Sequence, residues 1–132
     1  MVSRAEEAAQ RKSSGKYNCA QAVACTYCDL AGCDEETMAS ITAAFGTGMG
    51  NMQGTCGALI GAAVVTGMIR HDRNAARSAM KGMMDAFALR NGSVTCRDLK
   101  GIGTGKPLRS CNDCVADAAK LLESYLEESS GQ

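Results

Sequence analysis

Four of the eight cysteines follow an Asn, Thr or Ser, residues that favour the N-cap position of a helix. The pairs are Asn18-Cys19, Thr55-Cys56, Thr95-Cys96 and Ser110-Cys111. Each of these cysteines is therefore expected at the first position of a helix. Unpaired backbone N–H groups and the positive end of the helix dipole lower the pKa of a thiol there. Because a thiolate attacks disulfides and binds metals, the pattern predicts reactive sulfur chemistry.

The spacing of apolar residues predicts that two of these cysteines face the interior. Cys19 shares an apolar stripe with Val23 and Tyr27, and Cys111 lies four residues before the apolar Val115. We therefore predict that four sulfurs converge at helix starts, those of Cys19, Cys56, Cys96 and Cys111. Such a centre suits an iron–sulfur cluster held by thiolates, and it suits two dithiol pairs equally well.

Two C-x-x-C spacings, at residues 25–28 and 111–114, are typical of a four-thiolate zinc site. On a helix, however, Cys28 lies roughly 180° and Cys25 about 120° from Cys19. One metal ion cannot bind all three thiols, and Cys25 is predicted to face outward. No role is predicted for four cysteines, Cys25, Cys28, Cys33 and Cys114.

Two glycine-rich segments, 46–54 and 101–105, resemble nucleotide-binding loops only superficially. Neither has the G-x-G-x-x-G spacing after a strand, and neither is a P-loop. Their glycines are expected to let the backbone pass close to packed helices or to a cofactor. Gly54 and Gly57, which flank Cys56, are the predicted cofactor contacts. The single histidine, His71, is predicted at a helix end on the surface, which leaves no Ser/His/Asp arrangement for hydrolysis.

The composition limits the classes of function. The chain has 132 residues, enough for one domain with an ordinary core. Its 14 basic and 14 acidic residues cancel, so neither nucleic acid nor an acidic membrane is an expected partner. With three Tyr, two Phe and no Trp, the chain also has few rings on which bases could stack.

The N-terminal segment 1–16 is polar, so we expect no secretory signal and a cytoplasmic protein. Cysteines of cytoplasmic proteins serve redox chemistry or metal binding more often than structural disulfides. Eight cysteines in 132 residues therefore favour a redox or metal function.

Helical periodicity recurs along the chain and strand patterns are almost absent, which predicts an all-α fold. We expect a single-domain helical bundle over residues 1–132, with about five to six helices and glycine-rich loops. Residues 1–16 are expected to be a helical or loose extension. Further helices are expected over residues 19–30, 34–44, 56–69, 72–91 and 111–127, with a short helical turn after Thr95.

Residues 37–69 contain no charged side chain, and the apolar part, 56–69, is too short to span a membrane. We interpret residues 56–69 as a central buried helix with small residues at four-residue spacing. The alternative is a homo-oligomer interface, because a helix that is apolar all round needs much interior.

The motifs together resemble one family, the C_GCAxxG_C_C redox-active proteins. The resemblance covers about residues 17–126, from Asn18-Cys19-Ala20-Gln21-Ala22-Val23 to Cys111. Its middle is Phe45-Gly46-x-Gly48-Met49-Gly50, followed by Cys56-Gly57-Ala58-Leu59-Ile60-Gly61-Ala62 and Cys96-Arg97-x-Leu99. The chain reads C-G-A-x-x-G where the family label places Cys beside Ala. The position of Cys56 in the motif therefore depends on the flanking glycines.

The resemblance implies a helical protein with redox-active cysteines, and some relatives are described as selenoproteins. A related helical domain occurs beside cytochrome and iron–sulfur redox proteins, which favours cluster binding. Our first hypothesis is electron transfer with an unidentified redox partner protein, through an iron–sulfur cluster held by Cys19, Cys56, Cys96 and Cys111. The alternatives are a thiol–disulfide oxidoreductase in which Cys56 is the nucleophile and Cys19 a second catalytic thiol, and a non-enzymatic zinc or helical interaction module.

Overall fold

The structure, a computed structural model, describes residues 1–130. Over these residues the fold is all-α, as predicted, with eight helices, of which six have at least seven residues. The six longer helices match the predicted five to six, and the two additional ones are short. The helices are α1 (Ala5–Ser13), α2 (Cys19–Thr26), α3 (Glu35–Thr42), the π-helical turn η1 (Gly48–Met52), α4 (Gly57–Arg70), α5 (Arg73–Asn91), α6 (Cys96–Lys100) and α7 (Cys111–Ser130).

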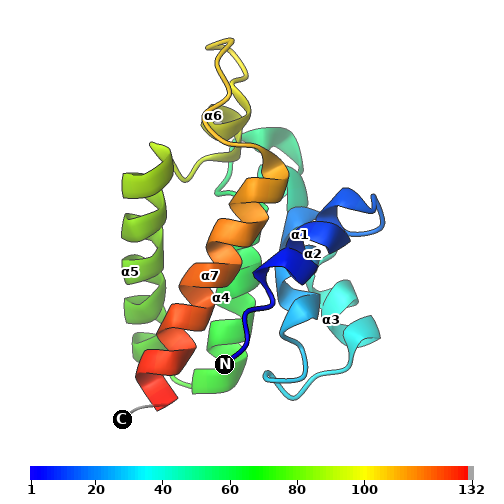
Figure 1. The fold of residues 1–132 in the computed structure, drawn as a ribbon, viewed down its shortest axis with the longest axis vertical. Coiled ribbons are helices and arrows are strands. Elements are labelled where there is room, and N and C mark those ends of the chain that lie inside the picture. Colours follow the sequence, from blue (N-terminus) through cyan, green and yellow to red (C-terminus); the bar gives the residue numbers. More distant parts are fainter. Residues whose placement is uncertain (131–132) are drawn as a thin grey trace.

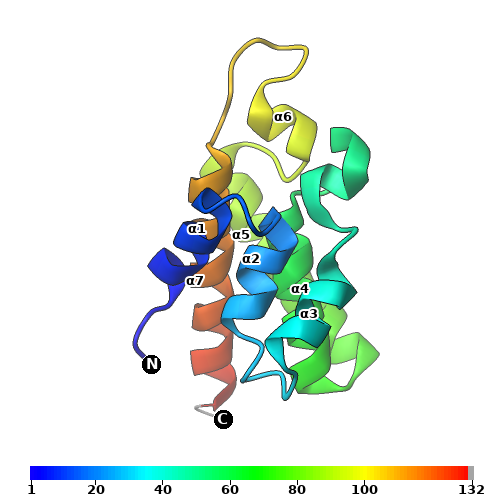
Figure 2. The ribbon, with the colours of Figure 1, turned by 90° about the vertical axis from the view of Figure 1, so that its right-hand side faces the viewer.

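Helix α4, which carries no charged residue before Arg70, lies at the centre of the bundle, as predicted, and packs against α2, α5 and α7. Helix α1 covers α7 and α2, and α3 covers the outer side of α2. Figure 2 shows that α2, α4 and α7 all begin toward the same end of the molecule, where η1 and α6 also lie. The positive ends of three helix dipoles therefore point toward that end. The homo-oligomer interface on α4 stays a prediction.

Small residues bring α2 and α4 into close contact. A Cβ atom added at Gly61 would lie 2.4 Å from the carbonyl oxygen of Ala20. No side chain fits in that space, so only glycine allows the two backbones to approach this closely. This contact sets the position of Cys19, one residue before Ala20, relative to α4.

The predicted helix starts are largely correct. The Asn18 side chain accepts a hydrogen bond from the backbone N–H of Gln21, whose side chain caps Asn18 in return. The Asp34 and Asp72 side chains accept hydrogen bonds from backbone N–H groups in the first turns of α3 and α5. The predicted length of α2 is wrong, because the helix ends at Thr26 instead of residue 30. Leu30 then lies in a turn with 41% of its surface exposed, outside the apolar stripe.

The N-terminal segment is a packed helix. Ala5 and Ala8 of α1 are buried. Arg4, just before α1, donates hydrogen bonds from its side chain to Asp29 and from its backbone N–H to Glu123, at 2.7 Å each. The buried Tyr27 hydroxyl also donates to Glu123. One carboxylate on α7 thus joins α1 and the end of α2 to the bundle.

No helix over residues 1–130 is both long and apolar enough to cross a membrane.

The α2–α4 contact can be tested with Gly61→Ala. The added methyl group must push the two helices apart, so we expect the free energy of unfolding to fall by about 1–3 kcal/mol in chemical denaturation. Gly67→Ala on the same helix is the matched control, because a Cβ there meets nothing within 4 Å. That variant should be neutral or gain up to about 1 kcal/mol from helix propensity. Equal effects of the two substitutions would contradict the close approach.

The Glu123 carboxylate should make the stability of the fold depend on pH. Burial alone would raise the pKa of its carboxyl, but hydrogen bonds from Tyr27 and from the N–H of Arg4 give a net lowering. A carboxyl with a lowered pKa in the folded state stabilises the protein above its unfolded pKa, and this contribution is lost as pH falls. We expect Glu123→Gln to lose about 1–3 kcal/mol at neutral pH. When the pH is lowered from about 6 to about 3, the free energy of unfolding of the variant should fall by less than that of wild type. The exposed Glu6→Gln should behave like wild type in both respects.

Candidate functional site

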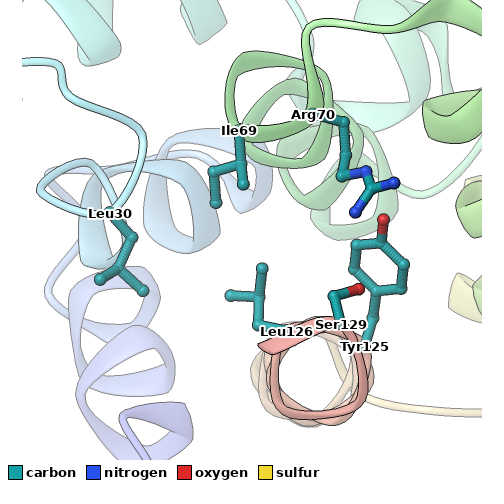
Figure 3. A pocket seen from close by; sticks show the side chains of 6 residues that line it. All are labelled: Leu30, Ile69, Arg70, Tyr125, Leu126 and Ser129. Atoms are coloured by element: carbon teal, nitrogen blue, oxygen red, sulfur yellow. The ribbon is translucent and has the colours of Figure 1, made fainter. Parts of the chain in front are cut away.

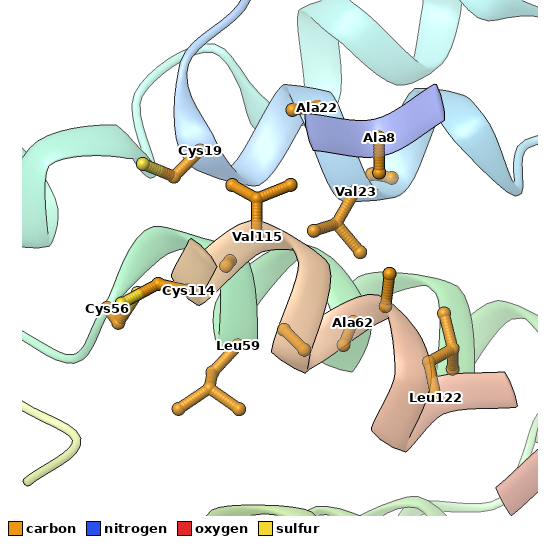
Figure 4. Close-up of a cluster of buried hydrophobic side chains, with 14 of the residues drawn as sticks. Ala8, Cys19, Ala22, Val23, Cys56, Leu59, Ala62, Cys114, Val115 and Leu122 are labelled. Carbon is orange, nitrogen blue, oxygen red and sulfur yellow. The ribbon is translucent and has the colours of Figure 1, made fainter. Parts of the chain in front are cut away.

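Five thiols surround one small cavity at the end of the molecule where the helices begin. Its lining consists of Cys19, Cys56, Gly57, Cys96, Leu99, Lys100, Arg109, Cys111 and Cys114. The cavity is about 10 Å³, room for about one water molecule. Figure 4 shows the Cys56 and Cys114 side chains lying together, with Cys19 nearby on the adjacent helix. All eight cysteines of the chain carry free thiols.

The four cysteines predicted to converge all lie on this cavity. Cys19, Cys96 and Cys111 occupy the first positions of α2, α6 and α7, as predicted. The predicted helical position of Cys56 is wrong by one residue, because Cys56 is itself the N-cap of α4. Thr55 lies one residue outside the helix, where it pairs with Thr95.

That pairing brings Cys56 and Cys96 together. Thr55 and Thr95 form an isolated antiparallel bridge. The N–H of Cys56 donates to the Val94 carbonyl at 2.7 Å, and the N–H of Cys96 donates to the Gly54 carbonyl at 3.0 Å. Two hydrogen bonds thus hold the backbones that lead into α4 and α6 side by side.

The glycine-rich segments fit against the cysteines. A Cβ at Gly48 would lie 2.6 Å from the Cys96 Cβ, and one at Gly57 would lie 3.1 Å from the Cys19 Cβ. Gly57, a predicted cofactor contact, lines the cavity. Gly54, the other, is not among the lining residues and closes the preceding loop, with its N–H on the Gly48 carbonyl at 3.0 Å.

Cys111 and Cys19 form a hydrogen-bonded pair. The Cys19 thiol donates to the Cys111 sulfur, and this bond, with help from Lys100 and Lys12, lowers the pKa of Cys111 to about 6. The same bond and burial raise the pKa of Cys19. Near neutral pH the pair therefore consists of a thiolate at Cys111 and a thiol at Cys19.

Cys56 and Cys114 form a second pair of the same kind. The Cys114 thiol donates to Cys56, which lowers the pKa of Cys56 despite its burial. The backbone N–H groups of Ala58 and Leu59, at the start of α4, lower it further. The pKa of Cys114 is raised by the bond to Cys56 and by burial.

Four low-pKa thiols are predicted by the helix-start argument, and the structure supports two of them. Cys56 and Cys111 have lowered pKa values, whereas that of Cys19 is raised by its hydrogen bond to Cys111 and that of Cys96 by burial. The prediction fails for Cys19 because this thiol keeps its proton and donates it in the hydrogen bond to the Cys111 thiolate. For Cys96, the five-residue helix α6 supplies a weak dipole.

Only one thiol of the cavity is partly open to solvent. The side chains of Cys19, Cys56, Cys96 and Cys114 are at most 8% exposed, whereas Cys111 is half-buried. Beside it, Arg109 is held by the buried carboxylate of Asp117, with Nε 3.0 Å from Oδ2. Of the five cavity cysteines, Cys111 is therefore the most accessible to a solute, and Lys100 and Arg109 lie on the same lining.

The sequence reasoning missed Cys114. Its position three residues after Cys111 and four before the buried Ala118 puts it on the inward face of α7. That spacing is the signal for an inward thiol, although a C-x-x-C is also typical of a metal site.

Three cysteines lie outside the cavity lining, Cys25, Cys28 and Cys33. The prediction that Cys25 faces outward is wrong, since only 2% of it is exposed. Helix α3 covers that side of α2, and the Cys25 thiol donates to the Glu35 carbonyl at 3.8 Å. His71 caps the end of α4 on the surface, as predicted.

Thiolates are the donors that zinc and iron–sulfur clusters require, so the chemistry of the donor set fits either group. Over residues 1–130, no three His, Cys, Asp or Glu side chains are arranged as ligands of one metal ion. As they stand, four of the cavity thiols are arranged as two hydrogen-bonded pairs.

A wider pocket of about 400 Å³ lies at the opposite end of the bundle. Its walls include Leu30, Ile69 and Leu126, and the Tyr125 hydroxyl points toward the Arg70 guanidinium (Figure 3). No cysteine lines it, so it is separate from the thiol chemistry.

Comparison with known proteins gives one match. The sequence model of a family described as "Putative redox-active protein (C_GCAxxG_C_C)" matches residues 17–125. No curated protein and no solved structure matches the chain.

The Cys19–Cys111 bond can be tested by alkylation kinetics. In wild type, Cys111 should react with iodoacetamide faster than the other seven thiols, with a midpoint near pH 6. Cys19→Ala removes the hydrogen-bond donor and moves the pKa toward the usual cysteine value. We expect the rate near pH 6 to fall roughly tenfold, because the loss of thiolate outweighs its higher intrinsic nucleophilicity.

Two variants serve as controls for that measurement. Cys19→Ser keeps a hydroxyl donor and should retain much of the low pKa, whereas Cys25→Ala, on the same helix, should leave the profile unchanged. A profile of Cys111 that does not respond to Cys19→Ala would show that the pair does not exist.

Proposed function

We propose that this chain, which belongs to the C_GCAxxG_C_C family, is a thiol–disulfide oxidoreductase in which Cys111 is the attacking thiol and Cys19 the resolving thiol. The observation that carries the proposal is the hydrogen-bonded pair itself, with its thiolate on the one partly exposed cysteine of the cavity. A buried thiol lies beside it, ready to displace whatever Cys111 captures.

The first step forms a mixed disulfide. The Cys111 thiolate attacks one sulfur of a substrate disulfide, a Cys111–S–S–R bond forms, and the other half of the substrate leaves as a thiolate. Lys100 and Lys12 stabilise the attacking thiolate. Lys100 and Arg109 flank the cavity, where their charge also favours the departing thiolate.

The second step releases the product. Once Cys111 is in a disulfide, its negative charge no longer holds the proton on Cys19, so the pKa of Cys19 falls. Cys19 gives up this proton and attacks the Cys111 sulfur, which forms the Cys19–Cys111 disulfide and expels the second thiolate. Two electrons have passed from the protein to the substrate, whose two thiolates become thiols by taking up the proton from Cys19 and one from water.

The second pair, Cys56 and Cys114, is suited to reduce the Cys19–Cys111 disulfide back to two thiols. In that reaction the Cys56 thiolate attacks the Cys19–Cys111 disulfide, and Cys114 resolves the resulting mixed disulfide. The Cys19–Cys111 pair is reduced and the Cys56–Cys114 pair is oxidised, so the protein as a whole neither gains nor loses electrons. Cys56 is therefore proposed as the nucleophile that attacks within the protein, because it is too buried to react directly with a large substrate.

The proposal can be tested by trapping. Reduced protein is titrated anaerobically with 2-hydroxyethyl disulfide, and the linkages are mapped by mass spectrometry. Wild type should first form the Cys19–Cys111 disulfide. Cys19→Ala should stop at a mixed disulfide on Cys111, because it lacks the resolving thiol.

The matched control is Cys25→Ala, which removes another buried thiol from the same helix and should form the same disulfide as wild type. If Cys111 stays a thiol while other cavity cysteines oxidise, the assignment of the attacking residue is wrong.

A second candidate function is electron transfer through a cluster held by Cys19, Cys56, Cys96 and Cys111. The observation in its favour is Cys96, a fifth thiol on the cavity that neither hydrogen-bonded pair uses. Such a cluster would supply one-electron chemistry when bound.

Anaerobic purification followed by iron, sulfide and zinc analysis decides between the two functions. Stoichiometric iron and sulfide, lost in Cys96→Ser, would favour the cluster. A metal-free protein that completes the trapping sequence above would favour the thiol–disulfide reaction.

A further inference from the structure

A second group of thiols lies at the end of α2 and on the turn that follows it, outside the lining of the thiol cavity. Cys25 is near the end of α2, and Cys28 and Cys33 lie in the turn between α2 and α3. From Cys19 to Cys28 the rise along a helix would be about 13 Å, so this group is well separated from the cavity. None of these three residues has a part in the reaction proposed above.

The turn has a defined backbone geometry. Residues 27–31 make one helical turn, in which the N–H of Ala31 donates to the Tyr27 carbonyl at 3.3 Å. Gly32 follows with a left-handed backbone, φ +71°. The N–H of Cys33 then donates to the Cys28 carbonyl at 3.0 Å, and the N–H of Gly32 to the Asp29 carbonyl at 3.2 Å. These two bonds together define a Schellman motif.

In a Schellman motif, the residue after the left-handed position folds back over the residue five positions earlier, and the two side chains typically make contact. Here those two residues are Cys33 and Cys28. Both are half-buried, so both are partly open to solvent. A disulfide spans a Cα separation of roughly 4.4–6.8 Å. The backbone hydrogen bond from Cys33 to Cys28, and the effect of Cys33 on the pKa of Cys28, place these two residues next to each other.

Cys25 differs from these two. It is buried, and its thiol donates to the Glu35 carbonyl under α3. A solute can therefore reach Cys28 and Cys33 but not Cys25.

We propose that Cys28 and Cys33 form a second dithiol site, which low-molecular-weight disulfides oxidise reversibly to a Cys28–Cys33 disulfide. One of the two thiols loses its proton and attacks a disulfide RSSR, which gives a mixed disulfide and one equivalent of RS⁻. The other thiol attacks the protein sulfur of the mixed disulfide, loses its proton and expels the second RS⁻. The protein gives up two electrons and two protons, and RSSR becomes two RSH.

This site should react more slowly than the cavity. Burial and the nearby carboxylates of Glu35 and Asp29 raise the pKa of Cys28, so its thiolate is scarce near neutral pH. Oxidation of Cys28 and Cys33 should therefore follow that of Cys111 in time and accelerate with rising pH.

The test uses oxidised glutathione on the full-length, reduced protein, followed by quenching with an alkylating agent. Digestion before aspartate residues cuts at Asp29 and Asp34, so Cys33 is released in the peptide 29–33 and Cys28 remains in the peptide 1–28. We expect these two peptides to stay linked in wild type until a reductant is added.

Variants identify the linked residue, because the peptide 1–28 also holds Cys19 and Cys25. Cys28→Ser should abolish the link and leave Cys33 as a mixed disulfide with glutathione. Cys25→Ser is the matched control and should keep the link. A link that survives Cys28→Ser, or a wild-type protein in which Cys33 ends as a glutathione adduct or a free thiol, would overturn the proposal.

The Cys111→Ser variant separates this site from the proposed function. It removes the attacking thiol of the cavity, and the link between residues 28 and 33 should form as in wild type. If the link requires Cys111, Cys28 and Cys33 are not an independent site, whatever the outcome of the trapping experiment on the cavity.

Discussion

The hydrogen bond from a buried thiol to a neighbouring sulfur is the interaction on which the chemistry of this protein depends. It occurs twice around one cavity, from Cys19 to Cys111 and from Cys114 to Cys56. In a cavity that holds about one water molecule, solvent cannot replace the donor, so the charge on each acceptor depends on its partner. The proton is thereby divided unequally within each pair. That asymmetry gives one sulfur the nucleophilic role and the other the resolving role.

The rest of the fold places these sulfurs within reach of one another. Three helices begin at the same end of the bundle, and the close approach of α2 to α4 at Gly61 fixes their spacing. The bridge between Thr55 and Thr95 aligns two further chain segments, and Gly48 and Gly57 leave room for the sulfurs beside them. Glycine is needed at these positions because side chains there would occupy the space of Cys19 and Cys96.

The sequence predicts the helical fold and the convergence of four cysteines because both depend on local signals. Caps such as Asn18 and Asp72 act on the next few residues, and the apolar stripe of α7 identifies the inward side of Cys111. The pairing of thiols could not be predicted, because it depends on how α7 packs against α2 and α4. The same limit explains the errors about Cys25 and Cys114. Cys25 is buried by α3, which helical periodicity on α2 does not reveal, and Cys114 belongs to a pair whose other member is 58 positions away in the chain.

The most direct test of the account is a titration of all eight cysteines by NMR, with carbon-13 at the cysteine Cβ and the protein fully reduced. The account predicts that Cys111 loses its proton near pH 6 and Cys56 below the usual range, while Cys19 and Cys114 remain protonated far above it. A common midpoint for all four thiols, at about pH 8.5 as in unfolded peptides, would contradict it.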